Sequence, residues 1–211
     1  MDIKTSLIVL AVITVIFFLP NAMLGNLLAS LELPLVDDFN DNNLLHDSAW
    51  TIDSGDFYVE NGVLKGHGQA SIPIMHSTGT WEYVIHVPDN SQNGLWNYWL
   101  FRDDDDQGYY IKFNVFDGRY LISVNKQQNE GRDSVTEIIS DAPLNIDPGK
   151  ITKFRVTRDA SGNFKLYHKN HFYGQGKDNS NIIPQKMVIT TYSKQGFELD
   201  EIRASPDVVA P

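Results

Sequence analysis

The sequence contains no cysteine among its 211 residues. Disulfide bonds and thiolate metal sites are therefore excluded, and stability has to come from a packed hydrophobic core. A chain of this length can form one such core as a single domain. The sequence also lacks an Asn-x-Ser/Thr sequon, so it offers no site for N-glycosylation.

Positive charge is scarce. Lys and Arg number 17 against 27 Asp and Glu, which gives a formal net charge of -10 at pH 7. Proteins that bind nucleic acids need basic surface patches, so a nucleic-acid partner is not expected. Motifs of nucleophilic hydrolases and phosphate-binding loops are absent as well. His168 and His171 lie close together without a third ligand, which does not make a zinc site.

Long apolar runs occur only near the N-terminus. Residues 6–19 are apolar after Lys4, which resembles the centre of a signal peptide. A membrane span needs about 20 residues, and here it would extend over residues 6–28. We expect residues 1–30 to form a hydrophobic helix, either a cleaved signal peptide or a retained membrane anchor. In both cases the remaining chain is expected outside the cytoplasm, secreted or anchored to the outer face of the cytoplasmic membrane.

After the leader, no stretch has the pattern of a long amphipathic helix. Along residues 81–87, one face instead carries Trp81, Tyr83, Ile85 and Val87, and the other carries Glu82 and His86, which is typical of a strand with one buried face. Asn61-Gly62 and Asp117-Gly118 are typical of tight type I′ hairpin turns. Closely spaced strands without crossover helices predict an all-β fold, an antiparallel β-sandwich or jelly roll over residues 31–205. Residues 206–211 form a short tail.

The most distinctive stretch is Leu95–Phe116, in which two aromatic-rich segments flank the acidic run Asp103–Asp106. Gly108 ends this run, and the pattern predicts a β-hairpin. The four aspartates have two interpretations. They form a solvated loop whose charges are screened by salt, or they coordinate Ca²⁺ through carboxylate and carbonyl oxygens. They lack the Gly and Glu spacing of an EF-hand.

The register of this hairpin decides which side chains face the core. We place Phe101 opposite Tyr109, which puts Trp99 opposite Ile111 and Leu95 opposite Val115. Trp99, Phe101, Tyr109, Ile111 and Phe113 then form the core face. The other face is predicted to bind a ligand and carries Trp96, Tyr98, Arg102, Tyr110, Lys112 and Asn114.

Aromatic rings next to hydrogen-bonding side chains suit sugars. The apolar face of a pyranose stacks on a ring, and its hydroxyls need polar partners. The alternative is that Trp96 and Tyr98 lie under a loop or another sheet. A slip of one residue would exchange the two faces of the hairpin.

The order of several short motifs resembles the concanavalin A-like lectin/glucanase superfamily, which includes laminin-G-like jelly-roll domains. The resemblance extends over residues 35–204 and implies two curved antiparallel sheets, with a concave sheet that commonly holds sugars. Its motifs are Asp37-Asp38-Phe39, Trp50, Val59–Leu64, Trp81-Glu82-Tyr83, Phe101-Arg102, Gly108–Tyr110 and Phe197–Ile202.

The resemblance also implies a structural calcium ion near the sheet edge. First and last strands often neighbour each other in such sandwiches. We therefore expect Asp37 or Asp38 to pair with Asp200 around Ca²⁺. Apart from this ion, no cofactor is expected.

Retaining glucanases of this superfamily carry Glu-x-Asp-x-x-Glu on one strand face, and this chain lacks that motif. Glu198-Leu199-Asp200-Glu201 comes near it, but its last carboxylate comes too early in the spacing and would point away, so we interpret it as structural. A hydrolase would then need dispersed carboxylates that converge in three dimensions. The candidates are Asp53, Asp56, Glu60 and Glu82.

The leading hypothesis is an extracytoplasmic, non-catalytic carbohydrate-binding module whose partner is a polysaccharide or glycan. The first alternative is a glycoside-active hydrolase of the same fold. The second is a membrane-anchored accessory subunit, which would use the sandwich to bind a membrane protein and residues 6–28 to hold the bilayer.

Overall fold

A computed structural model describes residues 34–42, 44, 50–91, 93–128, 135–193 and 196–206. The chain divides into two units, Met1–Leu33 and Pro34–Pro211, and all described residues belong to the second. The predicted leader helix and the tail beyond Pro206 lie outside the described residues. Within the described part of the chain, no helix is long and apolar enough to cross a membrane.

The described residues form strands joined by turns and loops, which confirms the predicted all-β class. The tight turns at Asn61-Gly62 and Asp117-Gly118 have positive φ at both residues, as type I′ turns require. The strands are β1 (Leu35–Asp37), β2 (Thr51–Glu60), β3 (Val63–Pro73), β4 (Gly79–His86), β5 (Gly94–Arg102), β6 (Gly108–Phe116), β7 (Arg119–Gln127), β8 (Val135–Leu144), β9 (Ile151–Arg158), β10 (Asn163–His168), β11 (His171–Lys177), β12 (Lys186–Thr191) and β13 (Phe197–Ser205).

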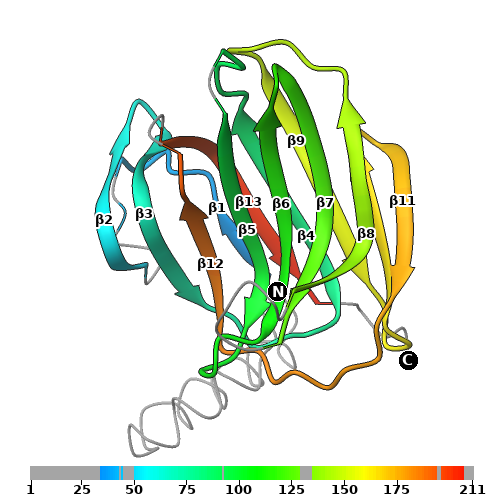
Figure 1. Ribbon diagram of the computed structural model, residues 1–211. Coiled ribbons are helices and arrows are strands. Elements are labelled where there is room, and N and C mark those ends of the chain that lie inside the picture. Colours follow the sequence, from blue (N-terminus) through cyan, green and yellow to red (C-terminus); the bar gives the residue numbers. More distant parts are fainter. Residues whose placement is uncertain are drawn as a thin grey trace, which may run out of the picture. The chain divides into compact units, whose positions relative to one another are not determined.

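The strands pair in the order β11-β10-β9-β4-β13-β3-β12-β5-β6-β7-β8, with β1 added to β13 and β2 added to β3. Only three residue pairs join β13 to β3, whereas β13 pairs over a longer stretch with β4. The structure therefore has two layers, as Figure 1 shows. We call β1, β13, β4, β9, β10 and β11 the back sheet, and β2, β3, β12 and β5–β8 the front sheet.

The core lies between the two layers and follows the alternation of the strands. On β4, Trp81, Tyr83 and Ile85 are fully buried, while Glu82 and Val84 are partly exposed. At one edge the sheets approach closely, because β11 contacts β8 across the sandwich. A Cβ atom at Gly176 would lie 2.0 Å from the backbone oxygen of Ile138, so only glycine fits there.

The β5–β6 hairpin contains a bulge that the sequence pattern did not reveal. Phe101 lies opposite Tyr109, as predicted, but Trp99 lies opposite Tyr110 instead of Ile111. β5 accommodates one extra residue, Leu100, between these two pairs. Leu100 and Phe101 are both fully buried in the main core.

The bulge exchanges the two faces of β5 before Leu100, so the predicted faces of Trp96, Tyr98 and Trp99 were wrong. Trp96 and Tyr98 belong to the main core and are 1% and 2% exposed. Trp99 lies on the opposite side of the sheet, in a separate small cluster. The predicted pair of Leu95 with Val115 is also wrong, because Gly94 takes that position.

Candidate functional site

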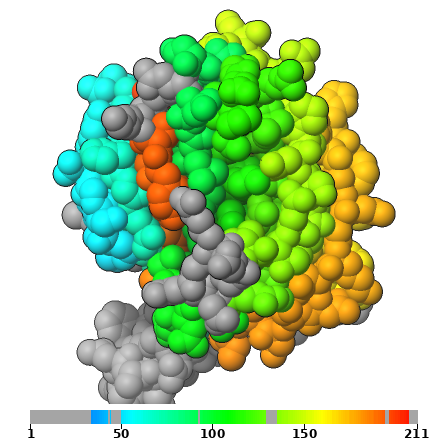
Figure 2. Space-filling view, viewed as in Figure 1, coloured from blue at the N-terminus to red at the C-terminus, as the bar shows by residue number. Residues whose placement is uncertain are grey.

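The outer side of the front sheet carries rows of mostly polar side chains. Figures 1 and 2 look onto this side, with β5–β8 in green to yellow-green. In one row the paired residues are Val188, Trp99, Tyr110 and Asn125, and in the next Thr190, Asn97, Lys112 and Ser123. Arg102 lies one row beyond, beside Lys186. We call this surface the polar face: Asn97, Trp99, Arg102, Tyr110, Lys112, Asn114, Ser123, Asn125, Val188, Thr190 and Tyr192.

Two aromatic rings form the centre of the polar face. The ring centroids of Trp99 and Tyr110 are 4.8 Å apart, and the Arg102 guanidinium lies 5.4 Å from the Trp99 centroid. Burial raises the pKa of Tyr110 to about 12, so its hydroxyl is protonated at neutral pH and can donate a hydrogen bond. Arg102 is in turn held by an ion pair of 3.0 Å with Asp106.

Two buried polar atoms on this face lack a hydrogen-bond partner among the described residues. They are the Oδ1 atom of Asn97 and the Nε atom of Arg102. Both residues are 8% exposed, so water does not readily supply the missing hydrogen bonds. Leaving a buried donor or acceptor unpaired costs about 1–3 kcal/mol. A ligand hydroxyl can remove this cost, because it both donates and accepts hydrogen bonds.

More exposed side chains border this centre. Lys112 Nζ on β6 lies 3.0 Å from Asp141 Oδ1 on β8, the second strand along the sheet. Tyr192 follows β12 directly, and its backbone N–H donates to the Leu95 carbonyl at 2.9 Å. Leu95 pairs with Asn114 on β6. The Tyr192 side chain is 69% exposed, which makes it an aromatic surface that a ligand can reach from solvent.

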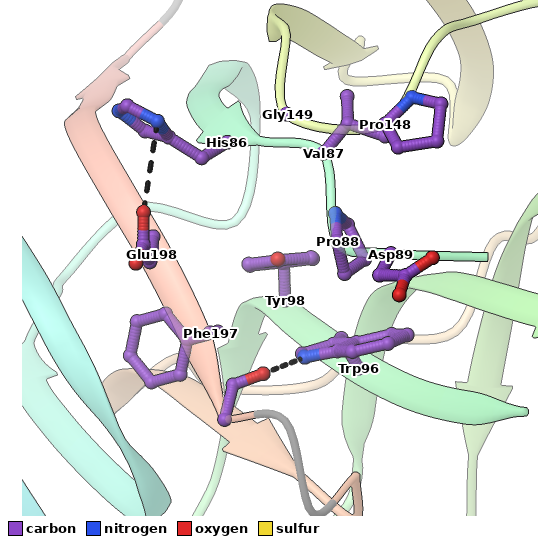
Figure 3. A pocket seen from close by; sticks show the side chains of 11 residues that line it. His86, Val87, Pro88, Asp89, Trp96, Tyr98, Pro148, Gly149, Phe197 and Glu198 are labelled. Atoms are coloured by element: carbon purple, nitrogen blue, oxygen red, sulfur yellow. Dashed lines mark hydrogen bonds and ion pairs between the residues drawn. The ribbon is translucent and has the colours of Figure 1, made fainter. Parts of the chain in front are cut away.

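A separate pocket opens at one end of the sandwich, between the end of β4 and the starts of β5 and β13. Its volume is about 420 Å³, and Trp96 and Tyr98 form part of its wall. Figure 3 shows Tyr98 at its centre, with Glu198 and Phe197 on one side and Asp89 on the other. Small-molecule sites typically combine an apolar concave wall with a few polar groups in this way.

No protein-family model and no curated protein sequence matches this chain. Solved structures do match it. The carbohydrate-binding module CBM66 from Bacillus subtilis aligns with a TM-score of 0.56 and 18% identity, over 72% of this chain and 91% of that one. The carbohydrate recognition domain of Emp47p aligns with a TM-score of 0.64 and 14% identity, over 84% and 96%. The Bacillus licheniformis β-glucanase aligns with 0.59 and 8%, over 82% and 97%.

The chain has the concanavalin A-like jelly-roll fold. At these identities, the likeness concerns the fold. It confirms the fold that the motif order implied.

The jelly roll divides the six predicted ligand-binding residues between its two sides. Arg102, Tyr110, Lys112 and Asn114 share the polar face. Trp96 and Tyr98 lie on the opposite side of β5 and line the end pocket. The six residues therefore do not form one surface, and their binding roles stay predictions.

Sequence reasoning missed seven residues of the polar face: Asn97, Trp99, Ser123, Asn125, Val188, Thr190 and Tyr192. Trp99 was assigned to the core face and Asn97 was not assigned to either face, because nothing in the local pattern marks Leu100 as a bulge. Tyr192 lies after a strand in Thr190-Thr191-Tyr192, where continued alternation from Val188 was a usable signal.

The predicted calcium ligands lie near one strand pair of the jelly roll. β1 pairs with β13, so the first and last strands are neighbours, as expected. Asp37 accepts hydrogen bonds from the Trp50 indole at 2.8 Å and a backbone N–H, and Asp38 accepts one from Asn40. Within the described ranges, no three His, Asp or Glu side chains are arranged to hold a metal ion. Calcium at Asp37, Asp38 and Asp200 stays a prediction from the resemblance.

Two of the four aspartates in the hairpin loop, Asp103 and Asp106, have partners close to the loop. Asp103 Oδ1 accepts backbone N–H groups of Asp105 at 3.0 Å and Gln107 at 2.8 Å. Asp106 pairs with Arg102. These contacts explain how a solvated loop keeps one conformation despite four adjacent carboxylates.

The structure does not bring the dispersed carboxylates together. Glu82 lies on the back sheet, where it pairs with Lys153 at 2.9 Å. Asp53, Asp56 and Glu60 lie on β2, which pairs with β3 at the edge of the front sheet. Asp53 accepts a hydrogen bond from Gln69, and Glu60 accepts one from Lys65. A paired acid and base need close carboxylates on one surface, and this set does not supply them.

Proposed function

We propose that this protein is a non-catalytic carbohydrate-binding module and that its polar face holds the glycan. The observation that carries the proposal is the pair of unpaired polar atoms, Asn97 Oδ1 and Arg102 Nε, beside the Trp99–Tyr110 rings. Polar atoms without hydrogen-bond partners destabilise a packed core, and they also destabilise this surface when no ligand is bound. It suits a ligand that is apolar on one side and rich in hydroxyls at its edge.

The layout of the polar face fits an extended glycan better than a single sugar. Along β6, six residues separate the row of Arg102 from the row of Asn114, which corresponds to about 20 Å. Tyr192 at one end supplies an exposed ring for stacking. Lys112 and Asn114 supply hydrogen-bond donors and acceptors between that ring and the central pair.

The fold supports this function. Two of the similar structures are described as a carbohydrate-binding module and a carbohydrate recognition domain. A third is a β-glucanase, but the Glu-x-Asp-x-x-Glu motif is absent from this sequence. The proposal therefore follows the binding members of the fold rather than the catalytic ones.

The proposed location is outside the cytoplasm, where polysaccharides are accessible. The apolar run in residues 6–28 supports export or membrane anchoring. The proposal accommodates both a secreted module and one held at the outer face of the cytoplasmic membrane.

Tyr192→Ala tests the proposal. Affinity gels and a glycan array should identify a polysaccharide that retains the wild-type protein. The substitution should weaken that binding about tenfold, because an aromatic contact contributes about 0.5–1.5 kcal/mol beyond its buried area. The thermal midpoint should hardly change, since the side chain is 69% exposed.

Phe172→Ala is the matched control, because this side chain is 56% exposed and lies on β11 of the back sheet. It should leave glycan binding unchanged. A wild-type protein that binds no polysaccharide contradicts the function. Binding that survives Tyr192→Ala, or that falls equally with Phe172→Ala, contradicts the assigned surface.

A further inference from the structure

A second pocket lies at the other end of the sandwich from the end pocket, among the loops next to the start of β4. We call it the loop pocket, and its volume is about 520 Å³. The connection from β11 to β12, residues 178–185, forms one side of it. Figure 1 shows this connection in orange, running across the lower end of the sandwich. No residue of the polar face lines the loop pocket.

Two of the loops that form the wall are held against each other. The Asp178 backbone N–H donates a hydrogen bond to the Gly162 carbonyl at 3.0 Å. Gly162 has a φ of +73°, and a Cβ atom there would lie 2.2 Å from the Asp178 backbone oxygen, so this close approach requires glycine. Because the wall is preformed, a ligand loses little binding energy to reordering of the loops.

A buried guanidinium group borders the loop pocket. Arg158 is 7% exposed, and it donates hydrogen bonds to the carbonyls of Ser77 at 2.8 Å and Ser180 at 3.1 Å. Its Cζ atom lies 5.3 Å from the ring centroid of Tyr109 and 5.4 Å from that of Phe164. Among the described residues, carbonyl oxygens and aromatic rings surround this charge, and no carboxylate forms an ion pair with it.

Arg158 keeps hydrogen-bonding capacity that the protein does not use. A guanidinium has more N–H donors than these two carbonyls accept from. Its Nε atom is buried and has no partner in the described part of the chain. Buried charges are normally paired with an opposite charge, because an unpaired one is costly. An anion in the loop pocket would supply the missing negative charge.

The rim of the pocket is also positive. Lys177 is exposed there, and within the described ranges its side chain has no ion pair or hydrogen bond. No Asp or Glu is among the described residues that line the pocket. Carboxylates of the adjoining loops have partners of their own. Asp178 pairs with Lys126 at 3.1 Å, and Asp159 accepts two backbone N–H groups of its own turn, both at 2.9 Å.

Neutral hydrogen-bond donors complete the lining. They are the hydroxyls of Thr78 and Ser161 and the amides of Asn179 and Asn181. Such groups can donate to anion oxygens without adding negative charge. Guanidinium groups pair strongly with oxyanions, since their planar fork matches the spacing of the oxygens.

We propose that the loop pocket binds a sulfate or phosphate group, either as a free ion or as an ester on a sugar. Arg158 and Lys177 neutralise its charge, and the hydroxyl and amide groups of the loops donate hydrogen bonds to its oxygens. The volume of about 520 Å³ lies within the range of roughly 300–1,000 Å³ that is typical of small-molecule sites. The site is additional to the glycan surface on the front sheet and does not depend on it.

Calorimetric titration of the full chain tests the loop pocket, in a chloride buffer of constant ionic strength. The probes are inorganic sulfate, inorganic phosphate, glucose 6-sulfate, glucose 6-phosphate and glucose. At least one of the four anions should bind, and glucose should not bind there, because only the anions pair with Arg158 and Lys177. Tighter binding of a sugar ester than of the matching inorganic ion assigns the site to an ester, and the reverse order assigns it to a free ion.

Three substitutions locate the binding. Lys177→Gln should weaken anion binding about threefold to fivefold, the range of a partly exposed ion pair. Arg158→Lys keeps the charge but loses the fork, and it should weaken binding about tenfold. Lys169→Gln is the matched control, because this exposed lysine lies in the turn between β10 and β11, at the far end of β10. It changes the net charge equally and should leave the affinity unchanged.

The absence of binding by all four anions overturns the proposal. Equal affinities of wild type and Lys177→Gln also overturn it, as does an equal loss with Lys169→Gln, which would reflect net charge and not a site. If Arg158→Lys fails to fold, the comparison of Lys177→Gln with Lys169→Gln still decides. Tyr192→Ala should leave anion binding unchanged, so failure of this site can be distinguished from failure of the glycan surface.

Discussion

The two outer faces of the sandwich differ in how their polar side chains are used. On the back sheet, Glu82 pairs with Lys153, whose side chain is 41% exposed, and Glu201 pairs with Arg203, which is 50% exposed. On the front sheet, the polar face keeps Asn97 and Arg102 at 8% exposure around a pair of aromatic rings. Charges meet solvent on one side, and amides, hydroxyls and rings are shielded on the other.

The difference shows why period-two alternation by itself does not identify a solvent face. Both outer faces alternate with apolar core residues, so they have the same local pattern. Exposed ion pairs contribute little to stability and tolerate substitution. Buried polar groups without partners are costly, so a fold that keeps them has a use for them.

The largest loss of stability is expected for Trp96→Ala. Trp96 lies on the core side of β5, the strand whose other side carries the polar face. Trp96 is 1% exposed, and its ring packs 5.8 Å from Phe113. Removing a buried tryptophan should lower the free energy of unfolding by about 3–5 kcal/mol. Urea denaturation followed by circular dichroism measures this change.

Trp96→Phe serves as the conservative variant and should recover much of that loss. A Trp96→Ala protein with wild-type stability and lost polysaccharide binding would show that Trp96 belongs to the ligand surface. That result would overturn the division of β5 into a core side and a polar side.

An intermediate change in stability, this time an increase, is expected for Asn97→Leu. The Oδ1 atom of Asn97 is buried without a partner among the described residues. Replacing it with an apolar side chain of similar size should raise the free energy of unfolding by about 1 kcal/mol. The same variant should bind the polysaccharide several-fold more weakly, because a hydrogen-bonding group is lost.

Thr157→Val on the back sheet is the control for this trade between stability and binding. Thr157 pairs with Thr80 on the outer side of β9 and is partly exposed. It should change neither quantity appreciably. If Asn97→Leu destabilises the protein, the amide has a structural partner, and its proposed role in ligand binding fails.

The smallest change in stability is expected when either of two ion pairs is broken. These are Lys112–Asp141 on the front sheet and Lys153–Glu82 on the back sheet. Their N–O distances are 3.0 Å and 2.9 Å. Lys112→Met and Lys153→Met should each change the free energy of unfolding by less than about 1 kcal/mol, because exposed pairs are weak. Only Lys112→Met should lower polysaccharide affinity, by about threefold. If the two variants bind the polysaccharide with equal affinity, Lys112 does not belong to the binding surface.

Much of the fold could be predicted because its signals are local. The turns at Asn61-Gly62 and Asp117-Gly118 need residues that tolerate positive φ, and both occur where expected. β11 was not predicted, because Gly174 and Gly176 interrupt its alternation. These glycines are explained by close contact with Ile138 and Ile139 of β8, which no local pattern reveals.

Less of the candidate site could be predicted, because a bulge changes side-chain direction without a mark in the sequence. Arg102 and Tyr110 were placed on the outer side by alternation counted from the hairpin loop. Beyond Leu100 the same count failed, and Trp96 and Trp99 exchanged sides. A single extra residue, Leu100, is enough to cause this error. Side chains on a strand alternate with period two, so one inserted residue reverses the side of every residue before it.

The sequence by itself determined the all-β class, the turn positions, the absence of disulfides and the acidic surface. These depend on residue type and on neighbours a few positions away. Only the tertiary structure decided which aromatics are core, that Asn97 and Arg102 lie on the same outer side of β5, and that Glu198 and Asp89 border one pocket. Those relations depend on a bulge fitted against Met187 of β12 and on contacts between strands that are distant along the chain.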